Sequence, residues 1–382
     1  MPYFESRRCG DADSHLMEDA GWLASYADAG IRDRLPGFTP ALSAAVAAGL
    51  KRRVVPGDEV DPLDLLRAKG WSAFGALHAA ERSVVLDHLG IGAQLVFPTF
   101  APSQFMFSKD DDVLYGGVDA LNRGMADACS GDSRLLPVGL VMLRDPERAL
   151  LALERAIDNG CRAIWIPTTA AGGRSPAHVA HDPFWATLAD AGLPFVCHVG
   201  AGSGSLKPAW HDNGRPIPRD HLGGGENLRS KDFPSIHHTT ETFLSCLVLD
   251  GVFERFPELR GGVIELGASW VPGFLRSLDS AARQFSKFEP MLGELTLSPS
   301  DYIRRHVKFT PFPFDDAGWL IDSEGDSLFM FSTDYPHPEG GRDPLAKFEA
   351  SLDAAGVGDA ARDRFYADNF DELMGRSPVM AQ

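Results

Sequence analysis

Residues 134–168 have the sequence RLLPVGLVMLRDPERALLALERAIDNGCRAIWIPT, which predicts a strand, a helix and a second strand in succession. The outer segments, RLLPVGLVML and RAIWIPT, are short and almost continuously apolar, which is typical of strands buried on both faces of a parallel sheet. Between them, Asp145 is suited to cap a helix, Pro146 to occupy its first position and Gly160 to end it. This stretch therefore predicts two parallel strands joined by a helix.

The same alternation continues through most of the chain. Apolar segments that predict strands lie at 93–100, 134–143, 162–168, 194–200, 259–269, 307–313 and 327–338. One more strand, which would end in DADSH at 11–15, brings the number of strand–helix units to eight, the number that closes a barrel. We therefore predict an α/β fold, a (β/α)8 TIM barrel that forms a single domain over residues 1–382.

A doubly wound sheet is the alternative fold. It would carry a glycine-rich phosphate turn directly after an early strand, whereas GGGENLRS at 223–230 follows a polar loop. Helices are predicted between the strands of the barrel, at 79–91, 118–131, 145–160, 182–192, 239–257, 271–287, 315–325 and 343–356, and again at the C-terminus. The segments 16–78 and 201–238 are long for barrel connections, so we expect them to form lids over the mouth at the carboxyl ends of the strands.

Composition limits the classes of function. The chain is 44% hydrophobic and carries a net charge of −17, so it is too apolar for disorder and too acidic to favour nucleic acid or anionic membranes as partners. Its five cysteines include no CxxC pair, which indicates reduced, buried thiols. The N-terminus MPYFESRRCGDADS lacks the apolar part of a signal peptide, and no stretch predicts a membrane span, so we expect a cytoplasmic protein.

In a barrel of this kind, functional side chains project from the carboxyl ends of the strands. The polar residues placed there are Asp13 and His15 on the first strand, His198 on the fifth, Glu265 on the sixth and Asp334 on the eighth. Four of these five residues are good ligands for a divalent metal ion, and the fifth is a carboxylate. Because these strands end on one side of a closed barrel, we expect the five side chains to converge.

The run Asp11-x-Asp13-x-His15 allows several interpretations. A calcium loop that begins at Asp11 needs glycine at its sixth and glutamate at its twelfth position, where this chain has Leu16 and Trp22. A simple turn stays open, because aspartate and serine favour turns. The spacing of Asp13 and His15 puts both side chains on one face of an extended strand, as a shared metal ion requires. We therefore expect Asp13 and His15, and not Asp11, to be ligands.

Several segments together resemble one family. The opening motif of this family has the form D-x-H-x-H, which DADSH resembles. Its fourth and fifth strand regions resemble ERAIDNGCRAIWIP and DPFWATLADAGLPFVCHVG. Its sixth strand with the preceding helix resembles LVLDGVFERFPELRGGVIELGASWVP, and its eighth strand resembles FSTDYPHP. On these segments, which span nearly the whole chain, the sequence resembles the amidohydrolase superfamily. The matching branch is the amidohydrolase-related family, which contains aminocarboxymuconate semialdehyde decarboxylase and related aromatic-acid decarboxylases and hydrolases.

The resemblance implies roles for single residues. Asp13 and His15 take the metal positions of the first strand, His198 that of the fifth, and Asp334 that of the eighth, where the family's aspartate often touches the metal and handles a proton. One divalent ion is implied, zinc first and manganese as the alternative, because Asp13 is a harder ligand than the family's usual histidine. Glu265 also departs from the family, which usually has a catalytic histidine on the sixth strand.

The substitution at Glu265 leaves its role open. A glutamate acts as acid or base near neutral pH if burial or neighbouring charge raises its pKa; otherwise Glu265 could bind the metal or serve as a structural carboxylate. His238 is the candidate proton donor in place of the missing imidazole, with His237 and His337 as alternatives. The candidate substrate-binding residues are Arg174, whose guanidinium suits a carboxylate, Trp270, which suits an apolar pocket, and His337.

We interpret the chain as a metal-dependent hydrolase or nonoxidative decarboxylase of a small carboxylated or carbonyl-containing compound, aromatic or ring-derived. In hydrolysis Asp334 would take a proton from the attacking water, and in decarboxylation an acid would protonate the ring carbon as CO2 leaves. The alternatives are an inactive barrel that serves as a binding or scaffold protein, and a metal-free lyase that uses Glu265 and His238. The oligomeric state stays open, although enzymes of the family are often dimers or larger.

Overall fold

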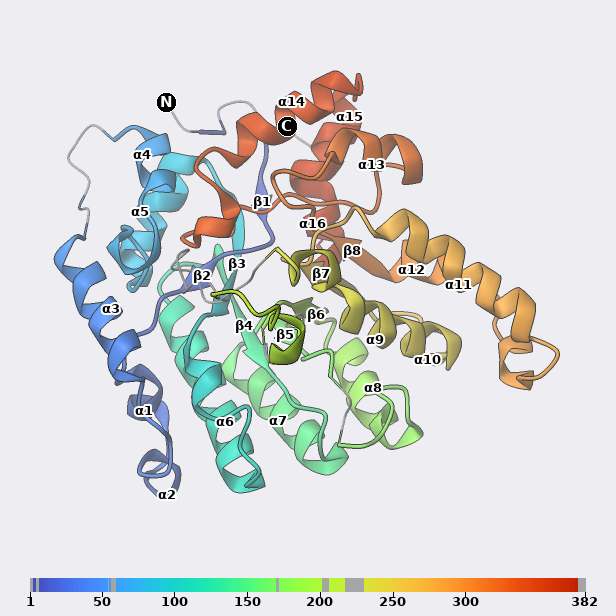
Figure 1. Cartoon of the computed structure of the whole chain (residues 1–382), viewed down its shortest axis with the longest axis horizontal. Coiled ribbons are helices and arrows are strands. Elements are labelled where there is room, and N and C mark those ends of the chain that lie inside the picture. Colours follow the sequence, from blue (N-terminus) through green and yellow to red (C-terminus); the bar gives the residue numbers. More distant parts are fainter. Residues whose placement is uncertain are drawn as a thin grey trace.

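A parallel β-sheet lies at the centre of the molecule and is surrounded by helices (Figure 1). The computed structural model describes residues 3–4, 7–53, 55, 60–169, 172–200, 206–216 and 230–376. Neighbouring strands follow the order β1-β3-β4-β5-β6-β7-β8, and β2 continues β1 and also pairs with β3. The strands are β1 (Gly10–Asp11), β2 (His15–Leu16), β3 (Ala93–Pro98), β4 (Leu135–Leu140), β5 (Ala163–Trp165), β6 (Phe195–His198), β7 (Gly261–Ile264) and β8 (Val307–Phe309).

Residues 328–335 close the sheet into a barrel. They run between β8 and the first strand, with parallel bridges at Phe309–Phe329 and at Ser14–Tyr335. Because β1 and β2 are two parts of one strand, the closing segment brings the number of strand positions to eight, as predicted. All residues of the strands are buried, which agrees with their continuous apolar sequences. The predicted (β/α)8 barrel is therefore confirmed.

Asp11 joins the first strand to the closing segment. Its carboxylate is fully buried and accepts hydrogen bonds from the backbone N–H of Asp13 (3.2 Å) and Thr333 (2.8 Å), from the Thr333 hydroxyl (2.5 Å) and from the Gln94 amide (2.7 Å). Burial raises the pKa of Asp11 to about 6, although these hydrogen bonds act in the opposite direction. One carboxylate thus fixes the relative positions at which the first and last strands end.

The helices alternate with the strands largely as predicted. Those outside the barrel are α5 (Ala79–Leu89), α6 (Asp111–Cys129), α7 (Pro146–Asn159), α8 (Asp182–Asp190), α9 (His238–Leu249), α10 (Val252–Arg255), α11 (Val271–Phe285), α12 (Pro299–His306), α13 (Ala317–Glu324), α14 (Pro344–Ala354), α15 (Asp359–Asp363) and α16 (Asn369–Leu373). The helix expected at 239–257 is divided between α9 and α10, because Gly251 adopts a φ of 70° there. The apolar pattern does not predict α12, since its sequence PSDYIRRH is mostly polar.

The segment 16–78 lies partly beside the barrel and partly at its mouth. Helices α1 (Trp22–Tyr26) and α2 (Ala29–Arg32) pack against α6, and α3 (Pro40–Lys51) and α4 (Pro62–Arg67) follow them (Figure 1). The chain then returns to the closing segment, where the backbone N–H of Gly70 donates a hydrogen bond to Pro336 O (2.9 Å). Of the lid expected at 201–238, the structure describes residues 206–216 and 230–238, and the rest lies outside the described residues.

The cysteines agree with the expectation of reduced, buried thiols. The five cysteines are free thiols, and four of them are buried. Burial raises the pKa of the Cys197 thiol far above its usual range, so this residue of β6 is a packing residue and not a nucleophile. Within the described residues, no helix combines the length and the apolar character that a membrane span requires.

Replacing Asp145 by alanine should destabilise the fold. The Asp145 carboxylate accepts a hydrogen bond from the backbone N–H of Arg148 (2.9 Å) at the start of α7, and losing this cap should lower the free energy of unfolding by about 1 kcal/mol. Chemical denaturation followed by circular dichroism measures the loss. Glu154→Ala, on the exposed face of α7, is the control, and equal midpoints for the two variants would show that the cap contributes nothing.

Replacing Asp11 by asparagine should have a larger effect. An amide brings two N–H donors to a point where four donors already converge, so at least one buried donor loses its acceptor, at a cost of about 1–3 kcal/mol. The same denaturation experiment tests this, with Asp322→Asn on the exposed surface of α13 as the control. If Asp11→Asn were as stable as the control, Asp11 would not be the connection that closes the barrel.

Candidate metal centre

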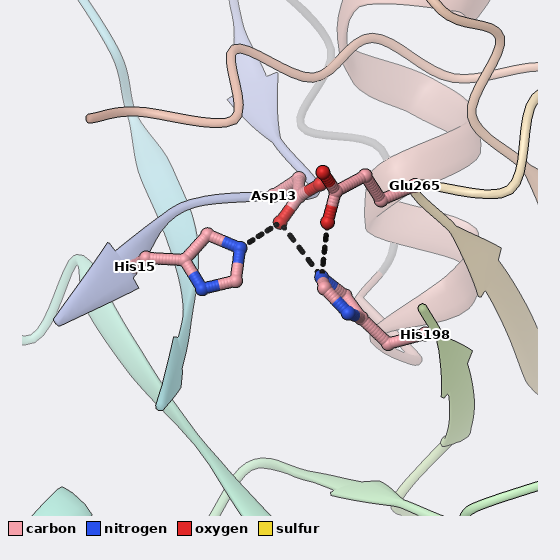
Figure 2. A group of neighbouring side chains, drawn as sticks. All are labelled: Asp13, His15, His198 and Glu265. Carbon is pink, nitrogen blue, oxygen red and sulfur yellow. Dashed lines mark hydrogen bonds and ion pairs between the residues drawn. The ribbon is translucent and has the colours of Figure 1, made fainter. Parts of the chain in front are cut away.

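Six polar side chains meet at the carboxyl ends of the strands. They form two overlapping groups, and within each group one ligand atom of every residue lies within 4.8 Å of the others. The first group is Asp13, His15, His198 and Glu265, which point toward one another in Figure 2, and the second is His15, Glu265, Asp334 and His337. The structure therefore brings together the five side chains expected at the strand ends and adds His337.

Glu265 and Asp334 are held by an unusual backbone conformation. Among the described residues they are the two non-glycine residues with a positive φ, 54° and 51°. This conformation costs about 1–3 kcal/mol and persists only where surrounding contacts impose it. Here the backbone N–H of Glu265 donates to the Thr310 hydroxyl (3.1 Å), and that of Asp334 donates to Asp13 O (2.9 Å). Strain of this kind is typical of functional sites.

The hydrogen bonding of His198 indicates a cation. Its Nδ1 lies 2.8 Å from Val199 O, and because a carbonyl only accepts, Nδ1 carries the proton. In the neutral ring Nε2 is then an acceptor, and it lies 3.4 Å from Asp13 Oδ1 and 3.3 Å from Glu265 Oε2. Three electron-rich atoms that face one another are suitable ligands for a cation. A divalent metal ion would supply the positive charge, with Nε2 as a ligand.

His15 is also prepared to bind a metal. Burial, followed by the neighbouring His337, lowers its pKa to about 3, so the ring is neutral at physiological pH, as a metal ligand must be. Its Nε2 lies 3.3 Å from Asp13 Oδ1 and 3.4 Å from Asp334 Oδ1, and neither ring nitrogen makes a hydrogen bond to any described residue. Buried polar atoms are normally hydrogen-bonded, so these nitrogens fit a ligand role.

Asp13 lies between the two histidines and is ionised. Burial raises its pKa, but the nearby imidazoles of His198 and His15 outweigh this effect and hold the pKa well below its usual range. Its Oδ2 is buried and has no hydrogen-bond partner among the described residues. Carboxylate oxygens and neutral imidazole nitrogens together are a suitable donor set for a divalent ion, so the residues present fit a metal.

His337 belongs to this centre, although the sequence suggested it only as a substrate-binding residue or proton donor. It is fully buried, and its ring stacks on His15 with 3.8 Å between centroids. Its Nδ1 lies 3.3 Å from Asp334 Oδ1, and its Nε2 lies 3.2 Å from the Thr99 hydroxyl. His337 therefore lies between the Asp334 carboxylate and the Thr99 hydroxyl, with one ring nitrogen near each.

Three other candidates lie outside the six-residue cluster. Arg174 is exposed on the loop after β5, and His238 is exposed at the start of α9. Trp270 is half-buried; its indole N–H donates to Leu266 O (3.2 Å) and Gly267 O (2.9 Å), so it packs over the loop that carries Glu265. Their roles in substrate binding and proton transfer stay predictions.

Two residues of the site were not found by sequence reasoning. Glu339 lines a small cavity together with Asp13, Glu265 and Asp334. Lys69 interacts electrostatically with Asp334 and Glu339, and burial lowers its pKa to about 8. Glu339 lies five positions after Asp334, and this short distance along the chain could have suggested that it belongs to the site. Lys69 comes from the 16–78 segment, and nothing in its local sequence indicates that it lies near Asp334.

The fold is a barrel, and the six-residue cluster forms a candidate metal centre at the carboxyl ends of its strands. The chain belongs to the amidohydrolase family, whose sequence model matches residues 11–373, so the resemblance seen in the sequence is confirmed. Among curated protein sequences none matches this chain.

Solved structures share this fold. An amidohydrolase from Mycobacterium avium subsp. paratuberculosis K-10 is 22% identical with a TM-score of 0.76, over 97% of this chain and 100% of that one. A 5-carboxyvanillate decarboxylase from Novosphingobium aromaticivorans DSM 12444, complexed with manganese and 4-hydroxy-3-methoxy-5-nitrobenzoic acid, is 18% identical with a TM-score of 0.65, over 97% and 96%. A 2,6-dihydroxybenzoate decarboxylase from Rhizobium is 17% identical with a TM-score of 0.61, over 97% and 99%.

Replacing His198 by alanine should abolish metal binding. The change removes a buried nitrogen donor, so protein stripped with a chelator and reloaded should retain less than about a tenth of an equivalent of Mn²⁺ or Zn²⁺. Plasma mass spectrometry measures the metal content. Cys197→Ala, one residue earlier on β6 and facing the other side of the sheet, is the control and should bind a full equivalent. If His198→Ala bound a full equivalent of metal, His198 would not be a metal ligand.

Proposed function

We propose that this protein is a metal-dependent carboxy-lyase that removes CO2 from a small aromatic acid with an oxygen substituent beside its carboxyl group. The observation that carries the proposal is the buried convergence of Asp13, His15, His198, Glu265 and Asp334 at the strand ends. Further support comes from the likeness to decarboxylases of 5-carboxyvanillate and 2,6-dihydroxybenzoate. The second of these substrates has a hydroxyl on each side of its carboxylate, an arrangement that can chelate a metal.

The residues that would hold the metal are Asp13, His15, His198 and Asp334, with Glu265 as a fifth candidate. A divalent ion supplies a Lewis acid that neutralises the substrate carboxylate and a neighbouring oxygen. We favour manganese over zinc, the reverse of the order expected from the sequence, because oxygen donors outnumber nitrogen donors in this set and suit a harder ion.

Asp334 and His337 are suited to the proton transfer. Decarboxylation breaks the bond between the ring carbon and the carboxylate, CO2 leaves, and the electron pair that stays on the ring takes up a proton. Asp334 is the proposed acid, since it faces the centre from the closing strand. His337, 3.3 Å from Asp334 Oδ1, holds that carboxyl in position and replaces its proton after each turnover.

A second candidate, hydrolysis of a neutral ester or amide, is favoured by the charge of the site. Asp13, Glu265, Asp334 and Glu339 line one cavity. A concentration of carboxylates disfavours an anionic substrate relative to a neutral one. In this reaction Asp334 would accept the proton of the attacking water, and the substrate would lose an alcohol or an amine.

Turnover assays of metal-loaded protein separate these functions. Stripped protein reloaded with Mn²⁺ or Zn²⁺ is incubated with 2-hydroxybenzoates, including 2,6-dihydroxybenzoate, and with neutral aryl esters, and CO2 release and substrate absorbance are recorded. We expect CO2 release with Mn²⁺, lowered at least about 100-fold by Asp334→Asn and unchanged by Asp322→Asn. Ester cleavage without CO2 release would select the hydrolase. A protein that binds no metal and turns over nothing would be the inactive scaffold.

A further inference from the structure

Three phenylalanines from two distant segments form a cluster that we name the aromatic wall: Phe233, Phe312 and Phe314. Phe312 and Phe314 follow β8 and stack with ring centroids 5.0 Å apart. Phe233 lies in the described end of the 201–238 segment and contacts both of them, at 5.5 and 5.3 Å. These separations are within the range of favourable aromatic pairs.

Phe312 connects the aromatic wall with the metal centre. It lines the same small cavity as Glu265 and Asp334, and its side chain is 8% exposed. Phe233 and Phe314 are 41% and 58% exposed. The aromatic wall therefore extends from the buried carboxylates to the surface.

The backbone around Phe312 is fixed. The Asp315 carboxylate accepts hydrogen bonds from the backbone N–H of Phe312 (3.0 Å) and of Ala268 (3.0 Å), so it ties the loop after β8 to the loop after β7. The Phe312 ring lies against Gly267, where a Cβ would come within 2.9 Å of a ring carbon. Because Gly267 is two residues from Glu265, this contact holds the ring beside the centre in advance of any ligand.

Packing explains Phe312 but not the exposure of the other two rings. Ligand sites typically combine apolar and aromatic walls with a few polar groups that fix orientation. The metal centre supplies such polar groups, and the aromatic wall is the continuous apolar surface next to them. It is also uncharged, so it can add affinity for an acid without adding to the negative charge of the site.

We propose that the aromatic wall binds the planar ring of the substrate and makes the site selective for aromatic acids over aliphatic acids. This inference rests on the proposed function for its substrate class and adds the residues that select it. A flat ring can pack on the exposed parts of Phe233 and Phe314 and touch the small exposed part of Phe312. A flexible chain offers no face to stack and loses more conformational freedom on binding.

The test measures binding, so that it does not depend on turnover. Manganese-loaded protein is titrated calorimetrically with 4-hydroxy-3-methoxy-5-nitrobenzoic acid as the aromatic probe and with glutarate as the aliphatic one. Phe312→Leu keeps an apolar side chain but removes the ring, and should weaken the nitrobenzoate about 3- to 10-fold while glutarate affinity and bound manganese stay unchanged. Phe233→Leu, at an exposed position that does not endanger folding, should weaken it about 2- to 3-fold.

Phe288→Leu is the matched control, because this ring is 79% exposed beyond the end of α11, and its affinities should equal those of the wild type. Two results would contradict the role of the aromatic wall: equal affinity of the wild type and both wall variants for the nitrobenzoate, or equal affinity of the wild type for the nitrobenzoate and glutarate. Neither result would contradict the decarboxylase proposal. If the wall variants bind the nitrobenzoate more weakly but the wild type releases no CO2, the wall proposal holds and the decarboxylase proposal is wrong.

Discussion

The buried carboxylate of Asp11 is the interaction on which the rest of the site depends. It accepts hydrogen bonds from the backbone of Asp13 and Thr333 and from the side chains of Thr333 and Gln94, so it joins the two ends of the barrel. Asp13 and Asp334, two residues of the metal centre, lie directly beyond this junction. A barrel closed in another register would separate them, because a shift of one residue moves every side chain to the opposite face of the strand.

The arrangement of the residues in the candidate metal centre costs free energy. Glu265 and Asp334 adopt a disfavoured backbone, and Asp13, Glu265 and the unprotonated Nε2 of His198 present electron-rich atoms to one another. Both features cost free energy in the folded protein, and a divalent cation offsets the electrostatic part. We therefore expect metal binding to raise the folding stability of this chain.

Sequence reasoning reached the strands and the residues at their ends, because buried parallel strands leave a strong apolar pattern. His198, Glu265 and Asp334 follow from that pattern, whereas Asp13 and His15 lie on the strand that was added to complete eight units. Lys69 and Phe233 do not follow from it, since they lie in long connections whose course is set by tertiary contacts and not by periodicity. Phe312 is a different case: it directly follows a predicted strand, but a phenylalanine there is indistinguishable in sequence from a core residue.

The closure of the barrel also sets an order of events during synthesis. Asp11 and Thr333 are 322 positions apart in the chain, so the first strand leaves the ribosome long before its last partner. At about 5–20 residues per second, that interval is roughly 15–60 s. During this time Asp13 and His15 belong to an open sheet edge and have no Asp334 to complete their site. The complete candidate metal centre therefore forms only after Asp334 and His337 have been synthesised.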